Sequence, residues 1–271
     1  MGMFGFAQKR REEYYLLKLV ARSVKEEADS SASLQDYLRG TFFWSKLLAA
    51  YLRSPRDRKY MKDVFGPLVR DNIFDNEGLD LESDPLQIYR AAINNEELST
   101  GQRSMRNPEV AREEAIRDPE TREVFIAHLQ DLRDIADHCF ALLEETLPRM
   151  PFGIRYTTQQ QYATLCQRFP HEDKQHLLQI SGHWLWRTYL LPALTQPEIW
   201  GVIDRGLSPI HKKNLNEVGR VVGQVFSGRL FGGENVYLQP LNTWVSESIE
   251  RLDGILMDSK YPVLSKARAE Y

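Results

Sequence analysis

The sequence predicts an all-α fold: a single large, non-repeating helical domain of about ten helices. Apolar residues recur at steps of three and four over long stretches, which is the pattern of amphipathic helices. Asp-Pro and Ser-Pro pairs, which favour the first turn of a helix, precede several of these stretches. Alternating strand patterns bounded by hairpin turns are absent from the sequence.

The bulk composition excludes several functional classes. The net charge of −3 gives no indication of nucleic acid or an anionic membrane as a partner. No apolar run approaches the roughly 20 residues that span a bilayer, and the N-terminus does not resemble a signal peptide, so we expect a cytoplasmic protein with no intrinsic membrane segment. The lone cysteines Cys139 and Cys166 suit a reducing compartment, and no histidine pattern predicts a metal site.

The clearest helix is predicted from Asp118 to Leu147. Asp118 and Pro119 supply a cap and a first helical residue, and Pro148 and Pro151 end the helix. One apolar stripe runs along it, formed by Phe125, Leu129, Leu132, Ala136, Cys139, Leu143 and Leu147.

Other segments follow the same logic. Helices are predicted over residues 11–28, 44–52, 84–93, 157–167, 173–189, 208–226 and 240–256. The polar stretch 98–117 is expected to be a surface excursion with some helix. We expect residues 1–271 to form one domain, with a central catalytic part of about 30–230 and the terminal helices as an additional helical subdomain.

One segment, D-Y-L-R-G-T-F-F-W-S-K from Asp36, has features that could carry chemistry. Arg39 and Gly40 lie between two helical stretches, and Gly40 permits a tight or left-handed backbone. A guanidinium is planar and permanently charged, and it suits a phosphate site if its support is rigid. Three aromatic residues follow and are expected to anchor the loop by burial: Phe42, Phe43 and Trp44. From this segment alone, a solvated arginine in a helix–helix turn is the simpler interpretation.

Several motifs resemble Ras GTPase-activating domains. The segment R-G-T-F-F-W-S-K, from Arg39 to Lys46, resembles the finger-loop motif F-R-G-N-S-L-A-S-K of that family, and V-F-G-P-L-V at 64–69 is similar to its L-L-D-P-L-L element. Other motifs resemble the IQGAP-related branch: R-R-E-E-Y at 10–14, M-P-F-G-I-R at 150–155, Phe169-Pro170, L-L-P-A-L at 190–194 and N-L-N-E-V-G-R at 214–220. The resemblance runs in one order from about Phe4 to about Leu252.

The resemblance implies that Arg39 is the catalytic arginine finger, which enters a GTP-loaded Ras-family GTPase in trans. It implies that Gly40, Arg187 and Thr188 support the finger loop. The positions implied to bind the GTPase are Leu38, Lys46, Leu190, Pro192, Ala193, Asn216 and Arg220. The chain should need no cofactor, because the partner carries GTP and Mg²⁺, and it would not be a self-contained enzyme. Its partner or parent chain would recruit it to the inner face of the plasma membrane.

The chain departs from the family pattern at the second arginine, which braces the finger loop in that family. Thr188 stands at this position, and the arginine lies one place earlier, as Arg187. A shift of one residue rotates a helical side chain by about 100°. Arg187 can therefore take the role only if the backbone adjusts. Leu191 and Asn216 replace a family Asn and Lys, while Arg220 keeps a second positive charge.

Two alternatives to a Ras activator stay open. IQGAP scaffold proteins lack the finger arginine and do not activate GTPases, whereas this chain keeps Arg39 and so resembles fungal Ras regulators of that branch. A non-catalytic, IQGAP-like module that binds GTP-loaded Cdc42 or Rac is the first alternative. A purely structural helical domain with an incidental loop arginine is the second.

Overall fold

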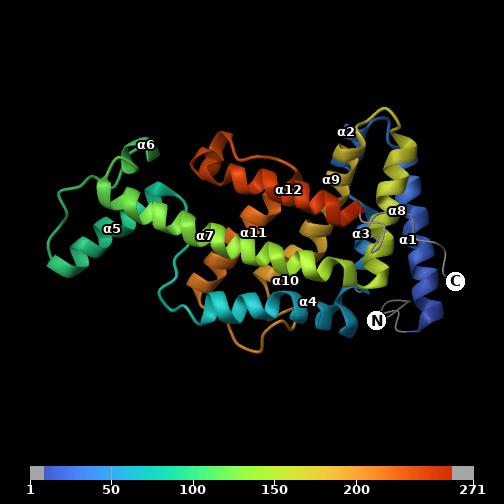
Figure 1. The fold of residues 1–271 in the computed structure, drawn as a ribbon, viewed down its shortest axis with the longest axis horizontal. Coiled ribbons are helices and arrows are strands. Elements are labelled where there is room, and N and C mark those ends of the chain that lie inside the picture. The colour runs from blue at the N-terminus through green and yellow to red at the C-terminus, as the bar shows by residue number, and fades with distance from the viewer. Residues whose placement is uncertain (1–8, 50, 258–271) are drawn as a thin grey trace.

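The computed structural model describes residues 9–49 and 51–257, and every regular element in these ranges is helical, which confirms the predicted all-α class (Figure 1). The elements are α1 (Arg10–Ser30), α2 (Leu34–Arg39), α3 (Phe43–Leu48), η1 (Tyr51–Arg53), α4 (Pro55–Leu68), η2 (Val69–Phe74), α5 (Pro85–Thr100), α6 (Arg112–Ala115), α7 (Pro119–Thr146), η3 (Leu147–Arg149), α8 (Phe152–Arg168), α9 (Lys174–Leu185), η4 (Trp186–Leu190), α10 (Leu191–Thr195), α11 (Pro209–Ser227), η5 (Gly233–Leu241) and α12 (Asn242–Met257).

Helix α7 crosses the body of the molecule and carries its central core face (Figure 1). It begins as predicted, with the Asp118 carboxylate accepting a hydrogen bond from the Thr121 amide at 2.9 Å. Every residue of its predicted apolar stripe is buried. Helices α4, α5, α11 and α12 pack against it, so the stripe is covered along its length.

The ends of other helices follow the caps in the sequence. Helix α11 starts after Ser208, whose hydroxyl accepts from the His211 amide, and ends at Gly228, which has a left-handed φ of 65°. Helix α5 starts at Pro85 and runs beyond its predicted end to Thr100. The predicted helix 173–189 is divided, because α9 passes into the π-helical turn η4 at Trp186.

Helix α4 is a long helix that the sequence did not predict. Pro67 lies inside it, and proline is strongly disfavoured in a helix interior because it lacks an N–H donor. Ser54 nevertheless caps the helix, with its side chain accepting from the Asp57 amide. Its apolar face, with Met61 and Phe65 fully buried, packs on α7. Tertiary packing therefore outweighs the local cost of the proline.

Helices α1, α2 and α8 lie together at one end of the molecule, opposite the excursion formed by α5 and α6 (Figure 1). A second apolar cluster fills this end: Ala28, Leu34, Tyr37, Leu165, Phe169 and Leu177. It fixes α2, and therefore Arg39, on α1, α8 and α9. The division into a central part and a terminal subdomain stays a prediction.

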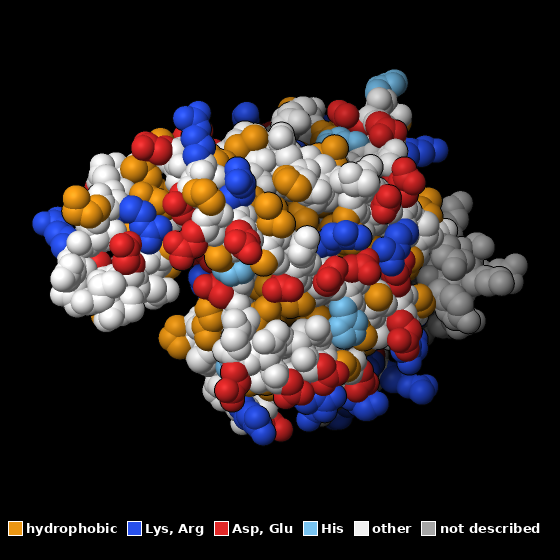
Figure 2. Space-filling model, turned by 60° about the vertical axis from the view of Figure 1, so that its left-hand side comes forward, with side chains coloured by type: hydrophobic (Ala, Val, Ile, Leu, Met, Phe, Trp, Pro, Cys, Tyr) orange, Lys and Arg blue, Asp and Glu red, His pale blue; other side chains and the backbone are white. Residues whose placement is uncertain are grey.

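The surface in Figure 2 carries interspersed acidic and basic side chains, with no extended field of one sign on that face. No helix in the described part of the chain is long and apolar enough to cross a bilayer.

Candidate functional site

Arg39 is the last residue of α2 and its side chain is exposed. The short helix is capped twice at its start, because the Ser33 hydroxyl accepts from the Asp36 amide at 3.1 Å and the Asp36 carboxylate accepts from the Ala32 amide at 3.0 Å. Within residues 9–49 and 51–257, the Arg39 guanidinium forms no ion pair or hydrogen bond. A cation at the C-terminal end of a helix is also favourably placed relative to the helix dipole. The group is thus charged, solvated and free to meet an anion.

Gly40 follows with φ −66° and ψ 153°, an extended conformation, so of the two possibilities, a tight or a left-handed backbone, the chain takes the tight one. Its amide donates to the Tyr37 carbonyl at 3.0 Å. A Cβ atom at this position would lie 3.0 Å from the same carbonyl oxygen, which is tighter than normal van der Waals contact. A side chain at position 40 would therefore crowd the tight end of α2.

An aromatic stack supports the loop between α2 and α3. The ring centroids of Tyr37 and Phe42 are 4.8 Å apart, those of Phe42 and Trp44 are 5.5 Å apart, and those of Trp44 and Trp184 are 4.7 Å apart. Trp44 is fully buried and Phe42 is half-buried, as expected for anchors. Phe43 is 58 % exposed, so the prediction that it anchors the loop by burial is wrong. It is the first residue of α3, and because adjacent side chains of a helix point about 100° apart, the Phe43 ring faces solvent while Trp44 faces the core.

The floor beneath α2 is also fixed by polar contacts. Gln161 of α8 donates to the Tyr37 hydroxyl at 3.5 Å. Burial raises the pKa of Tyr37 to about 12, so this hydroxyl stays protonated at neutral pH. Arg168, at the end of α8, donates to the Ser31 carbonyl at 2.7 Å and ties down the turn between α1 and α2.

Glu27 of α1 holds the other end of the loop, and the sequence analysis did not identify it. Its Oε1 atom accepts from the Phe43 amide at 2.9 Å and from the Trp44 amide at 3.2 Å. Ser23, one turn earlier on α1, donates its hydroxyl to the same oxygen at 3.2 Å. No local pattern connects a glutamate with amides 16 and 17 residues away, so only the folded structure identifies this contact.

The predicted brace, Arg187 and Thr188, lies in the π-helical turn η4. Arg187 is exposed and Thr188 is half-buried, while the next residue, Tyr189, points into the core and donates to the Asp57 carboxylate at 2.7 Å. Within the described residues Arg187 has no ion pair. Burial lowers the pKa of His183, one turn earlier, and the positive charge of Arg187 lowers it further.

The predicted partner-binding residues after this turn are not all at the surface. Leu190 and Ala193 are completely buried, so we correct their expected role from direct contact to support of the surface above them. Pro192, the second residue of α10, is half-buried. Helix α10 lies close against α11, because a Cβ atom at Gly219 would meet Leu191 at 2.7 Å.

The predicted residues of α11 and α3 differ in their availability. Asn216 and Lys46 are exposed, and Lys46 has no ion pair within the described residues. The Arg220 guanidinium pairs with Glu217, donates to the Ser83 hydroxyl and reaches Asn235 at 3.4 Å. Arg220 is therefore engaged within the chain, and a partner's carboxylate would have to displace these contacts.

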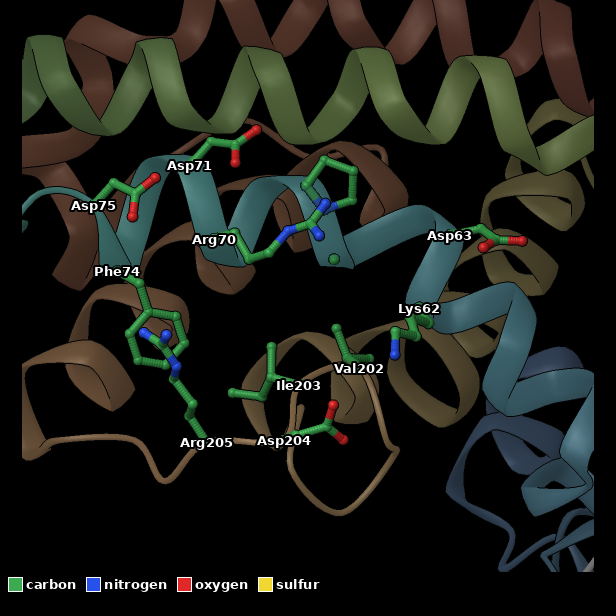
Figure 3. Close-up of a pocket in the computed structure, with 12 residues that line it drawn as sticks. Lys62, Asp63, Arg70, Asp71, Phe74, Asp75, Val202, Ile203, Asp204 and Arg205 are labelled. Atoms are coloured by element: carbon green, nitrogen blue, oxygen red, sulfur yellow. The ribbon is translucent and has the colours of Figure 1, made fainter.

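A hollow of about 800 Å³ lies between the α4–η2 segment and the loop 202–205 (Figure 3). Lys62, Arg70 and Arg205 border it, and Asp71 and Asp75 point away from it. Neither Arg39 nor any other predicted site residue lines the hollow, so it has no part in the arginine-finger argument.

The exposed arginine on its braced helical turn is the candidate site, and the class of the protein comes from comparison with known families. Residues 19–227 match the RasGAP family, described as GTPase-activator protein for Ras-like GTPase. The match covers more than half of the chain, and the chain therefore belongs to the RasGAP family.

The relatives are of the IQGAP and RasGAP-like type. The chain is 28 % identical over 253 residues to the mouse Ras GTPase-activating-like protein IQGAP2, covering 92 % of this chain and 16 % of the relative. It is 28 % identical over 258 residues to Ras GTPase-activating-like protein rgaA of Dictyostelium discoideum, covering 95 % and 31 % respectively. Identity to rng2 of Schizosaccharomyces pombe is 25 % over 258 residues, covering 95 % and 17 %. The chain thus spans a third or less of the length of these relatives.

Proposed function

We propose that this chain accelerates GTP hydrolysis by a Ras-family GTPase and that Arg39 is the arginine finger inserted in trans. The observation that carries the proposal is the exposed, unpaired guanidinium of Arg39 at the end of a helix braced on α1, α8 and α9. A surface arginine on a mobile loop would lose much of its conformational freedom on docking. An arginine on a pre-ordered turn loses less.

In the proposed reaction this chain supplies a positive charge and holds it in the right position. Phosphoryl transfer is limited by stabilisation of charge on the transferring group and by the placement of water. In the proposal the Arg39 guanidinium meets the γ-phosphate oxygens and its own carbonyl lies near the partner's catalytic glutamine. That carbonyl accepts no hydrogen bond within the described residues, which supports its availability. The partner carries the nucleotide and Mg²⁺, so this chain supplies no cofactor.

The surface around Arg39 supports docking of a partner. Leu38 is 39 % exposed and Phe43 is 58 % exposed, so apolar surface lies on both sides of the arginine in the sequence. Buried aromatic contacts with charged groups beside them are typical of interface hot spots. We assign Lys46 and Asn216 to the polar rim, and Arg187 with Thr188 to the support of the loop.

The test is single-turnover hydrolysis of GTP by Ras in the presence of this chain. We expect a large acceleration by the wild type and its loss in Arg39→Ala, with much of the binding to GTP-loaded Ras retained. Equal stimulation by wild type and variant would remove Arg39 from the mechanism.

A second function is a non-catalytic module that binds GTP-loaded Cdc42 or Rac. The similarity to IQGAP2 and the replacement of the second arginine by Thr188 favour it. The same hydrolysis assay with Cdc42 separates the two, because this function predicts a stable complex and an unchanged hydrolysis rate. An absence of binding to either GTPase would leave the purely structural interpretation.

A further inference from the structure

Helix α3 is capped from a distance. Six other helices start directly after a Ser or Asp whose side chain accepts a hydrogen bond from an amide of the first turn: α2, α4, α5, α7, α9 and α11. Phe42, before α3, has no such side chain. The first amides of α3 would be left without partners, and the Glu27 carboxylate of α1 satisfies two of them.

We propose that Glu27 is the positioning residue for Arg39, acting by fixing the start of α3 and with it the loop that ends α2. The proposal rests on the proposed function and adds a residue to it. Only Gly40, Thr41 and Phe42 separate Arg39 from the first residue of α3. A link of three residues leaves little independent freedom to its ends, so the position of α3 constrains the direction of Arg39.

The Glu27 carboxylate and its hydrogen bonds to the Phe43 and Trp44 amides form a clamp, and this clamp is itself held in place. The Ser23 hydroxyl donates to the same Glu27 oxygen and limits the rotation of the carboxylate. Glu27 lies near the end of α1, a helix of 21 residues that packs along α8. The negative charge of Glu27 at the start of α3 also interacts favourably with the partial positive charge of the first amides of that helix. The carboxylate thus connects a long, well-packed helix to the loop that follows Arg39.

The Phe42 ring fixes the loop by a second, independent route, through Tyr37 and Trp44. Loss of Glu27 should therefore loosen the loop without unfolding it. Misplacement of a reacting group by about 1 Å can lower a rate by about a hundredfold. We expect a loss of about tenfold to a hundredfold in the hydrolysis rate of Glu27→Ala at saturating protein, with binding to GTP-loaded Ras changed less than about threefold.

The experiment compares three variants in single-turnover hydrolysis and in binding. Glu27→Gln keeps an amide oxygen that can accept from the same amides, so its loss should be smaller than that of Glu27→Ala. Glu26→Ala is the matched control, because Glu26 is the adjacent residue on α1 and, among the described residues, its side chain pairs only with the exposed Arg22. Its rate should equal that of the wild type.

Measuring the effect of Glu27→Ala in a protein that already carries Arg39→Ala separates a positioning role of Glu27 from a general loss of structure. In Arg39→Ala, adding Glu27→Ala should lower the rate no further, because Glu27 acts through Arg39. An equal loss in both backgrounds, or an unchanged rate in Glu27→Ala, would overturn the proposal.

Hydrogen exchange at the Phe43 and Trp44 amides tests the clamp without any GTPase. We expect faster exchange at these amides in Glu27→Ala and unchanged exchange in Glu26→Ala; unchanged exchange in both would overturn the clamp. If the wild type fails to stimulate hydrolysis, the proposed function fails, whereas this exchange measurement still decides whether Glu27 fixes the loop.

Discussion

Replacing Arg39 by alanine separates function from stability in this protein. The side chain is exposed and has no ion pair or hydrogen bond within the described residues, so its removal should change the free energy of unfolding by no more than about 0.5 kcal/mol. For a domain of this size that corresponds to a shift in melting temperature of about 2 °C or less. The variant should therefore be as well folded as the wild type.

The expected kinetic effect is far larger. Arginine fingers contribute about 10³ to 10⁵ in kcat for this class of reaction, a general magnitude that corresponds to about 4 to 7 kcal/mol of transition-state stabilisation. Arg39→Lys keeps the charge but loses the planar fork of donors, so it should recover only a small part of the rate. The assay is single-turnover GTP hydrolysis by Ras at saturating protein, with the melting temperature measured on the same samples. A rate in Arg39→Ala within a few-fold of the wild type would refute the reasoning, because the remaining contacts would then carry the activation.

Three further predictions concern the predicted brace of the finger loop and the stability of the fold. Arg187→Ala should lower the hydrolysis rate more than Thr188→Ala, since Arg187 is exposed and unpaired; the reverse ranking in the same assay would contradict the predicted brace. Burial raises the pKa of Asp57 above its usual 3.8, so the folded state binds the proton more tightly than the unfolded state does. The free energy of unfolding therefore falls as the pH rises from about 3.8 to the raised pKa of the folded state. Asp57→Asn removes this titration and should gain stability relative to the wild type as pH rises, measured by urea unfolding; a pH-independent difference would be evidence against it. Gly153→Ala places a Cβ atom 1.8 Å from the Tyr51 hydroxyl oxygen and should destabilise the fold by about 1–3 kcal/mol, also by urea unfolding, whereas unchanged stability would show that Tyr51 moves aside easily.

Most of the helices could be predicted because residues at their ends signal where they begin and end. Asp118-Pro119 and Ser208-Pro209 mark the starts of α7 and α11, and Gly228 marks an end. Helix α4 shows the limit of local signals, because Pro67 argues against a helix that packing on α7 stabilises. The sequence signals of a helix end and of a proline tolerated inside a helix are the same, and burial decides between them.

The local geometry of the candidate site was predictable in part for the same reason. The exposed position of Arg39 follows from an arginine and a glycine at a helix end, which the sequence displays. The exposure of Phe43 was missed because three consecutive aromatic residues suggest burial for all, whereas a helical turn directs adjacent side chains to different sides. Glu27 was missed because its hydrogen bonds join two helices through the fold.

The π-helical turn η4 bears directly on the displaced arginine. An α-helix would put Arg187 about 100° away from the family position at Thr188. A π-helical turn closes i→i+5 hydrogen bonds, so it accommodates one extra residue and changes the register of the side chains before it relative to those after it. Residues Trp186–Leu190 form such a turn, and Tyr189 fixes its far side through the buried Asp57 carboxylate. The backbone adjustment that Arg187 needs is therefore available where the sequence departs from the family pattern, and this is why we expect Arg187 to contribute more than Thr188 to support of the loop.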